Sequence, residues 1–416
     1  MFVLPKLKTL FSTNKAHYFV ALILSTLMLG YAPSSIALAL LVVYCAIFFF
    51  TNKKFYSFKD LALLLPIILY VWFLTTYLWT LNEGLTLKGL GRMLALFLVP
   101  CSFLIIPKFT LDQFKFILNT YTCSNLLFGV LFIISAFIRY MKSRSFTEFT
   151  YHDLTLDFEL NAIYVSAFFS ISFFYLLLKS QKRPYELFAL IFLLFLLILL
   201  SSKSILFCTI LGTLLFGFRQ FYFKRIKFLK LVFGGILILL IISFSSKEIL
   251  KRVEEELVIN SREKISLQQV LEKDHFSKVY PWTGTSIRLF QLRLLKEQIQ
   301  EKRIFLKGFG LFASRDDLKK RHLKYGTYKG YHLYNYHNNY AQTFAESGIF
   351  GLFLILLIIA LNVLMAIRSK YFLFIFFSIL IPIWFFTESV LWVQRGLFFF
   401  IIFYCLFNRS IFTVRK

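Results

Sequence analysis

Acidic residues are scarce in this sequence, and so are the short motifs of metal- or nucleotide-dependent enzymes. Only 21 Asp and Glu residues stand against 47 Lys and Arg residues. The sequence contains no Asp-x-Asp pair, no Walker loop and no Ser-His-Asp arrangement. There is also no tandem repeat and no low-complexity tail, which excludes repeat architectures. We therefore expect neither a metal-dependent transferase nor a nucleotide-binding enzyme.

Cysteine is also sparse, with five residues in the whole chain. All five fall inside apolar segments, and none of them pair at metal-ligand spacing. They are Cys45, Cys101, Cys123, Cys208 and Cys405. We expect no disulfide, no zinc and no other cofactor.

What the chain has in abundance is apolar sequence: 58% of its residues are hydrophobic, 55 are Phe, and the mean hydropathy is +0.71. Runs long enough to cross a bilayer recur from end to end, which predicts an all-α polytopic membrane protein. The first run lacks a small-residue cleavage site, so we expect a retained helix rather than a signal peptide. About twelve transmembrane spans are predicted, at 17–32, 34–51, 60–80, 87–106, 114–140, 158–178, 185–201, 203–219, 228–246, 347–366, 371–391 and 396–411.

The distribution of basic residues predicts the orientation of these spans. Lys and Arg concentrate in alternate turns, which places both termini in the cytoplasm. The predicted organisation is nine helices in residues 1–246, a large periplasmic loop with amphipathic helices at 247–346, and three helices in 347–416. The net charge of +26 would suggest a nucleic-acid partner in a soluble protein. Here cytoplasmic loops, anionic lipid headgroups or a phosphorylated substrate account for it, and no nucleic acid is expected.

The segment from His332 to Gln342, just before the tenth span, is the most informative part of the loop. It interleaves aromatic residues with His and Asn. Tyr rings stack on sugar faces, and Asn and Gln bind hydroxyls, so Tyr334, Tyr336, Asn338 and Gln342 are candidate substrate-binding residues. The alternative is an interfacial aromatic belt, which Tyr forms in many membrane proteins.

A spaced motif in the same region resembles a known family. His337 and Asn338 are followed by nine residues, Gly348, two residues and Gly351. This order, at the end of a large loop entering a helix, resembles the O-antigen ligase and polymerase superfamily. The resemblance implies a metal-independent glycosyltransferase of GT-C type in the bacterial inner membrane. Such an enzyme takes a glycan from undecaprenyl pyrophosphate at the periplasmic face. Attack of the acceptor opposite the leaving group would invert the anomeric centre.

The resemblance also implies roles for two residues of the loop. His337 is the expected catalytic or acceptor-orienting residue, since an imidazole near neutral pKa can take the acceptor's proton. It could equally bind the leaving pyrophosphate as a cation. Arg288, on an amphipathic stretch before Gly308-Phe309-Gly310, is similar to a family arginine that offsets charge on the leaving group. The alternative for Arg288 is a solvated helix face.

Two further candidate sites lie outside the loop. In Ser202-Lys203-Ser204 a lysine replaces the family's arginine, so Lys203 is either a phosphate contact or an interfacial lysine. Glu388 and Arg395, near the last two spans, are expected either to contact substrate or to form a structural ion pair with each other. Asp157 and Glu159 are expected to open the sixth span as partners of its helix dipole.

The expected acceptor separates the remaining functional alternatives. An O-antigen ligase transfers the glycan to lipid A-core or a similar acceptor, and the spacing of the motif favours this activity. A polymerase transfers it to another lipid-linked repeat and would use the same residues. A lipid-linked glycan flippase is the alternative from a different class, but the absence of internal repeats disfavours a transporter. The oligomeric state is not predicted.

Overall fold

The structure is a computed structural model that describes residues 14–53, 60–222, 267–276, 282–302 and 304–409, with side chains of α11 described up to Arg219. Every regular element in these ranges is a helix. The first half of the chain comprises α2 (Ala16–Ser25), α3 (Tyr31–Asn52), α4 (Leu61–Thr75), η1 (Thr76–Leu78), α5 (Glu83–Met93), α6 (Ala95–Ile105), α7 (Leu111–Ser143), η2 (Phe146–Phe149), α8 (Tyr151–Leu154), η3 (Leu156–Phe158), α9 (Ala162–Leu177), α10 (Pro184–Leu200) and α11 (Lys203–Tyr222). The second half comprises α14 (Leu267–Glu272), α15 (Gly284–Lys302), α16 (Ser314–Lys324), η4 (Lys329–Leu333), α17 (Asn339–Ser369), α18 (Phe372–Thr387), η5 (Val390–Trp392) and α19 (Gln394–Asn408).

Five stretches of helix in the described residues are long and apolar enough to cross a membrane. They are Tyr31–Asn52, Leu61–Leu78, Glu83–Ile105, Leu111–Ser143 and Asn339–Ser369. Shorter apolar helices, such as α9, α10, α18 and α19, coincide with other predicted spans. The predicted ninth span, 228–246, lies outside the described residues. The membrane protein is thus confirmed, whereas the total of twelve spans stays a prediction.

Several boundaries differ from the predicted ones because local capping decides them. The predicted span 87–106 consists of two helices, α5 and α6, which meet at Leu94. The predicted tenth span begins eight residues earlier than 347, because the Asn338 side chain caps α17 by accepting from the Ala341 N–H. Asp157 and Glu159 lie in and after η3, and Asn161 caps α9 in their place. The expectation that these two acids open the sixth span is therefore wrong.

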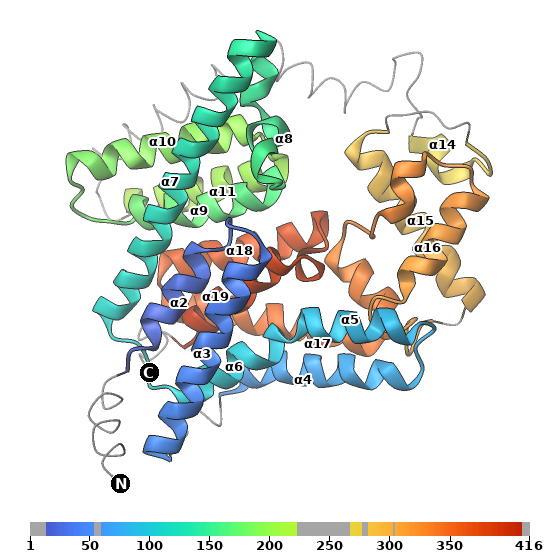
Figure 1. The fold of residues 1–416 in the computed structure, drawn as a ribbon, viewed down its shortest axis with the longest axis horizontal. Coiled ribbons are helices and arrows are strands. Elements are labelled where there is room, and N and C mark those ends of the chain that lie inside the picture. The colour runs from blue at the N-terminus through green and yellow to red at the C-terminus, as the bar shows by residue number, and fades with distance from the viewer. Residues whose placement is uncertain (1–13, 54–59, 223–266, 277–281, 303, 410–416) are drawn as a thin grey trace.

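The helices α14, α15 and α16 form a lobe beside the bundle of apolar helices (Figure 1). The lobe has its own hydrophobic core, which includes Phe276, Trp282, Phe290 and Tyr336. The bundle has a larger core built mainly from Phe and Leu side chains, into which Phe312 of the lobe also packs. The lobe is stabilised mainly by the burial of its apolar side chains away from water. The helices of the bundle are held together within the bilayer by close packing and hydrogen bonds.

A glycine kink in α17 attaches the lobe to the bundle. Gly348 has φ of 68°, and a Cβ at this position would lie 2.1 Å from the Leu306 carbonyl oxygen. Around the kink, the Phe309 and Gly310 N–H groups donate to the carbonyls of Ala345 and Glu346 at 2.8 and 2.9 Å. Only glycine, which has no Cβ, allows the two backbone segments to approach each other this closely. The spacing from His337 to Gly348 thus sets how the end of the loop meets the membrane helix.

Candidate active site

Three ionisable side chains from distant parts of the sequence meet where the lobe joins the bundle. Arg288 comes from α15, His337 from the turn before α17, and Glu388 follows the last residue of α18. The Arg288 Nη2 donates to Glu388 Oε1 at 2.8 Å, and the His337 Nδ1 lies 3.3 Å from Glu388 Oε2. Glu388 therefore bridges the two residues that sequence analysis predicted to be catalytic.

The guanidinium of Arg288 is fixed in place by backbone groups as well. Its Nε donates to the Thr387 carbonyl at 2.9 Å, and its Nη1 donates to the Gly284 carbonyl at 3.1 Å. An arginine has five N–H donors, so these three bonds leave one donor on each terminal nitrogen without a partner among the described residues. The side chain remains 32% exposed. A fixed, partly exposed fork of this kind suits bidentate binding of a phosphate.

His337 adopts an uncommon backbone conformation and presents one unpartnered ring nitrogen. Its φ is +47°, a left-handed value that non-glycine residues seldom adopt and that concentrates at functional sites. The His337 N–H donates to the Asn335 side-chain oxygen at 2.8 Å, which supports this turn. The Nε2 atom is buried and has no hydrogen-bond partner among the described residues. The Tyr334 ring packs edge-on against the imidazole, with centroids 5.0 Å apart.

Glu388 is buried, with 7% of its side chain exposed. Burial alone would favour the neutral acid. The hydrogen bond and charge of His337, together with the charge of Arg288, outweigh that effect and hold the pKa of Glu388 below its ordinary value. The carboxylate is therefore ionised at neutral pH. Because a carboxylate only accepts hydrogen bonds, the Nδ1 atom that faces Glu388 carries a proton, and in the neutral form of the imidazole the lone pair is then on Nε2.

Lys203 lies at the first position of α11, beside this cluster. The side chain is exposed, and the hydroxyl of the next residue, Ser204, is 3.3 Å from the Thr387 hydroxyl. Thr387 in turn supplies the carbonyl that holds Arg288. The structure thus brings the start of α11 to the same place as Arg288 and Glu388. Asn338 is adjacent as well, since its amide donates to the Phe386 carbonyl at 3.0 Å.

Two other predicted substrate-binding residues are enclosed in the protein. Tyr336 is fully buried, and its hydroxyl donates to Gln298 Oε1 at 2.6 Å inside the lobe. Gln342 is buried too: its amide nitrogen donates to the Glu346 carboxylate on the same helix at 2.5 Å, and its Oε1 accepts from the Tyr336 N–H at 3.1 Å. These contacts give both residues a structural role in joining the lobe to α17. The motif glycine Gly351 lies one turn beyond Gly348, where a Cβ would meet the Ser347 side chain.

Arg395 lies away from the cluster and does not pair with Glu388. Its guanidinium stacks over the Tyr31 ring at 4.8 Å, and its Nη1 donates to the Glu159 carbonyl at 3.3 Å. The expected Glu388–Arg395 ion pair is therefore wrong. The physical reason is that η5 separates the two residues, so Glu388 faces α15 whereas Arg395 lies in the first turn of α19.

Sequence analysis missed one buried carboxylate that organises the surroundings of the site. Glu346 accepts from the Phe312 N–H at 2.6 Å, the Ser314 hydroxyl at 2.9 Å and the Trp392 indole at 2.8 Å, in addition to Gln342. It thus ties the lobe, α17 and η5 together. An acidic residue at the entrance of an apolar run was a signal that would have revealed it.

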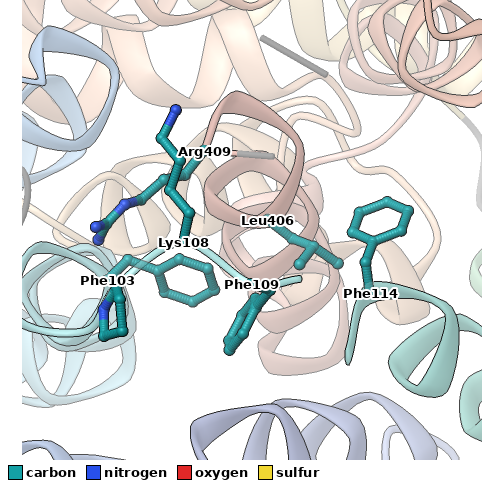
Figure 2. A pocket seen from close by; sticks show the side chains of 7 residues that line it. Phe103, Lys108, Phe109, Phe114, Leu406 and Arg409 are labelled. Carbon is teal, nitrogen blue, oxygen red and sulfur yellow. The ribbon is translucent and has the colours of Figure 1, made fainter. Parts of the chain in front are cut away.

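A small pocket lies at the other end of α19, far along the helix from Arg395. Figure 2 shows the rings of Phe103, Phe109 and Phe114 around Leu406, with the cationic side chains of Lys108 and Arg409 nearby. None of the predicted site residues lines this pocket.

Comparison with known proteins supports the resemblance drawn from the sequence. Residues 187–356 match the family model described as O-Antigen ligase. No curated protein matches the chain. The matched range contains Lys203, Arg288, His337 and both motif glycines. It supports a ligase- or polymerase-like glycosyltransferase activity and does not distinguish between the two. Residues 187–356 of this membrane protein thus match an O-antigen ligase domain, which supports the resemblance to the O-antigen ligase and polymerase superfamily.

Proposed function

We propose that this protein transfers a glycan from undecaprenyl pyrophosphate to lipid A-core or a similar acceptor at the periplasmic face of the inner membrane. The observation that carries the proposal is the Arg288–Glu388–His337 cluster at the junction of lobe and bundle. It combines a fixed cation with an imidazole of defined proton placement, which is what metal-independent glycan transfer from a diphosphate needs.

In this proposal Arg288 binds the pyrophosphate of the donor. The two N–H groups left over by its protein contacts point to a phosphate ligand, and negative charge grows there as the glycosidic bond breaks. Lys203 adds a second cation, next to Ser204 and Thr387. The polyprenyl chain lies among the apolar helices of the bundle.

His337 acts as the base that takes the proton of the acceptor hydroxyl. The Glu388 carboxylate holds the proton on Nδ1, which leaves the Nε2 lone pair for the acceptor. Tyr334 packs over the imidazole and moves aside as the acceptor enters. The hydroxyl oxygen then attacks the anomeric carbon opposite the diphosphate, so the bond forms with inversion. The alternative role, His337 as a cationic ligand of the pyrophosphate, requires protonation of Nε2.

Purified protein, lipid-linked donor and acceptor test the proposal directly. We expect His337→Ala and Arg288→Ala each to abolish formation of the new glycosidic bond while the protein still inserts in the membrane. His275→Ala and Lys296→Ala are matched controls, since both side chains are exposed on the lobe outside the cluster. Full transfer by both cluster variants would remove the assignment, and transport without bond formation would indicate a flippase.

Deletion of the gene separates a ligase from a polymerase. A ligase deletion leaves the lipid A-core without long glycan and lets lipid-linked polymer accumulate. A polymerase deletion leaves single repeats attached and shortens the chains. Gel analysis of cell-surface glycolipids, beside an extract of lipid-linked oligosaccharides, distinguishes these two results.

A further inference from the structure

A cavity of about 830 Å³ lies between α2, α7 and η3, apart from the catalytic cluster. One wall is a stripe along α7 formed by Thr120, Cys123, Leu127 and Leu131, which repeat at helical spacing. The last residue of α2, Ser25, and most of the turn that follows it up to Gly30 form the facing wall. The α7 stripe is about 16 Å long at 1.5 Å per residue. A cavity of this volume is large enough for a small amphiphilic ligand.

The walls along the stripe are apolar and open. Leu127 is 59% exposed and Leu29 is 58% exposed, although both line the cavity. α7 belongs to the helices that are long and apolar enough to span a membrane. Water is a poor solvent for such a surface, so in a bilayer a hydrocarbon chain fills it.

The mouth of the cavity carries one cation and two carboxylates. Arg395 lines it with Asp157 and Glu159. Arg139 already pairs with the Asp157 carboxylate, so the charge of Asp157 is compensated. The hydrogen bond that joins Arg395 to Glu159 uses the Glu159 backbone carbonyl, and among the described residues neither side chain has an ion-pair partner within salt-bridge distance. The Arg395 Nε is buried and also has no partner among them.

From these features we propose that the cavity binds one phospholipid whose headgroup carries both a phosphate and an ammonium group. The phosphate binds the Arg395 guanidinium, the ammonium binds the Glu159 carboxylate, and one acyl chain lies along Thr120–Leu131. The diphosphate donor is disfavoured here, because it would bring two negative charges against Glu159 and offers no cation in return. The site is thus chemically distinct from the Arg288 cluster.

Lipid binding to the purified full-length chain tests the site without any glycan donor. After delipidation, native mass spectrometry compares phosphatidylethanolamine with phosphatidylglycerol, which lacks the ammonium. We expect one tightly held phosphatidylethanolamine and about tenfold weaker phosphatidylglycerol, which corresponds to the loss of one charge-assisted contact. Glu159→Gln should remove this preference, and Arg395→Gln should weaken both lipids. Lys88→Gln, an exposed charge elsewhere, is the matched control.

The groove itself is tested on α7. Leu127→Trp fills the cavity and should prevent the protein from retaining phosphatidylethanolamine. Ile134→Trp lies on the same helix but outside the cavity and should leave lipid retention unchanged. The native Cys123 can report on lipid binding without any change to the cavity walls. It lines the cavity, and its side chain is exposed. In a Cys101→Ser background, phosphatidylethanolamine should slow maleimide labelling of Cys123 by at least about fivefold, as expected when ligand exceeds its Kd severalfold.

Three results would overturn the proposal: equal binding of the two lipids, an unchanged preference in Glu159→Gln, or unprotected Cys123 at saturating lipid. None of these depends on transferase activity. A failure of the lipid site is therefore distinguishable from a failure of the proposed function.

Discussion

At the scale of single residues, Glu388 explains why an arginine and a histidine far apart in the sequence belong to one site. Its carboxylate accepts from both side chains and remains ionised although it is buried. In the proposed mechanism it is a positioning residue, because it acts on the reaction through His337 and Arg288.

Replacement of Glu388 by Gln tests this positioning role. The amide keeps the size of the side chain but removes the negative charge that holds the Nδ1 proton, so kcat should fall about 10–100-fold. KM for the donor should change less, because Arg288 keeps its backbone contacts to Thr387 and Gly284. The pH profile of kcat should also change, since the negative charge next to the imidazole is gone. A purely structural role would lower the amount of folded protein and leave the profile of the remainder unchanged.

Arg288→Lys tests whether two parallel hydrogen bonds are needed at the pyrophosphate. Lysine keeps the charge but loses the planar fork and its backbone anchors, so transfer should fall about 10²–10³-fold. Initial rates with purified protein give the measurement, and Lys296→Arg on the same helix is the control. Wild-type rates in Arg288→Lys would show that a point charge is sufficient.

At the scale of elements, the kink of α17 determines how the loop lobe meets the membrane bundle. The kink opens the helix at Gly348, and the turn containing Gly308 and Gly310 packs against it. Gly308 has φ of +70°, and a Cβ there would lie 2.4 Å from the Glu346 carbonyl carbon. The two glycine motifs of the sequence therefore form the two sides of one contact.

Gly348→Ala should disrupt the contact between the kink of α17 and the turn that contains Gly308 and Gly310. An L-residue at positive φ costs about 1–2 kcal/mol, and the clash with the Leu306 carbonyl adds to that cost. We expect a lower unfolding temperature and strongly reduced transfer. Gly91→Ala is the control, because its Cβ would meet nothing within 4 Å and alanine favours the helix α5. Equal stability of the two variants would contradict the proposed role of the kink.

The lobe also contains a buried histidine that makes its stability depend on pH. Burial, with a smaller contribution from His332, lowers the pKa of His322 to about 4. Between this value and the unfolded value near 6.5, the unfolded chain takes up a proton that the folded lobe excludes. Stability is therefore full above about pH 6.5 and falls by up to ~3 kcal/mol as the pH drops to about 4.

Thermal unfolding or amide hydrogen exchange of the lobe at pH 7 and pH 5 checks this effect. His322→Gln cannot titrate, so it should lose most of the difference between the two pH values. His275→Gln, at an exposed position, should behave like the wild type. The same pH dependence in His322→Gln would show that other groups cause it.

At the scale of the whole molecule, the proposed function requires the lobe to face the periplasm. α17 is long enough to cross the bilayer, so Lys324 before it and Arg368 at its end should lie on opposite sides. An impermeant maleimide should label Lys324→Cys in cells with an opened outer membrane. It should label Arg368→Cys only after the inner membrane is broken, with wild type as the background. The reverse pattern would place the cluster on the cytoplasmic side, where the proposed donor is not presented.

The sequence predicted much of this molecule because its signals are local. Apolar runs predicted the membrane helices, and the spacing of His337, Asn338, Gly348 and Gly351 predicted the superfamily. Helix ends were less accurate where a single side chain caps the helix, as Asn338 does for α17. Arg288 and His337 were also selected from the sequence, and the structure brings them together through Glu388.

What only the tertiary structure decided is which distant groups share a partner. Glu388 faces Arg288 rather than Arg395, Tyr336 and Gln342 are enclosed, and Glu346 joins three elements. Hydropathy and motif spacing are properties of residues that are close together in the chain, so they can be read from the sequence without knowledge of the fold. The direction of a buried carboxylate depends on contacts between helices that lie up to 100 residues apart in the sequence, as Arg288 and Glu388 do, and it is set only when those helices pack.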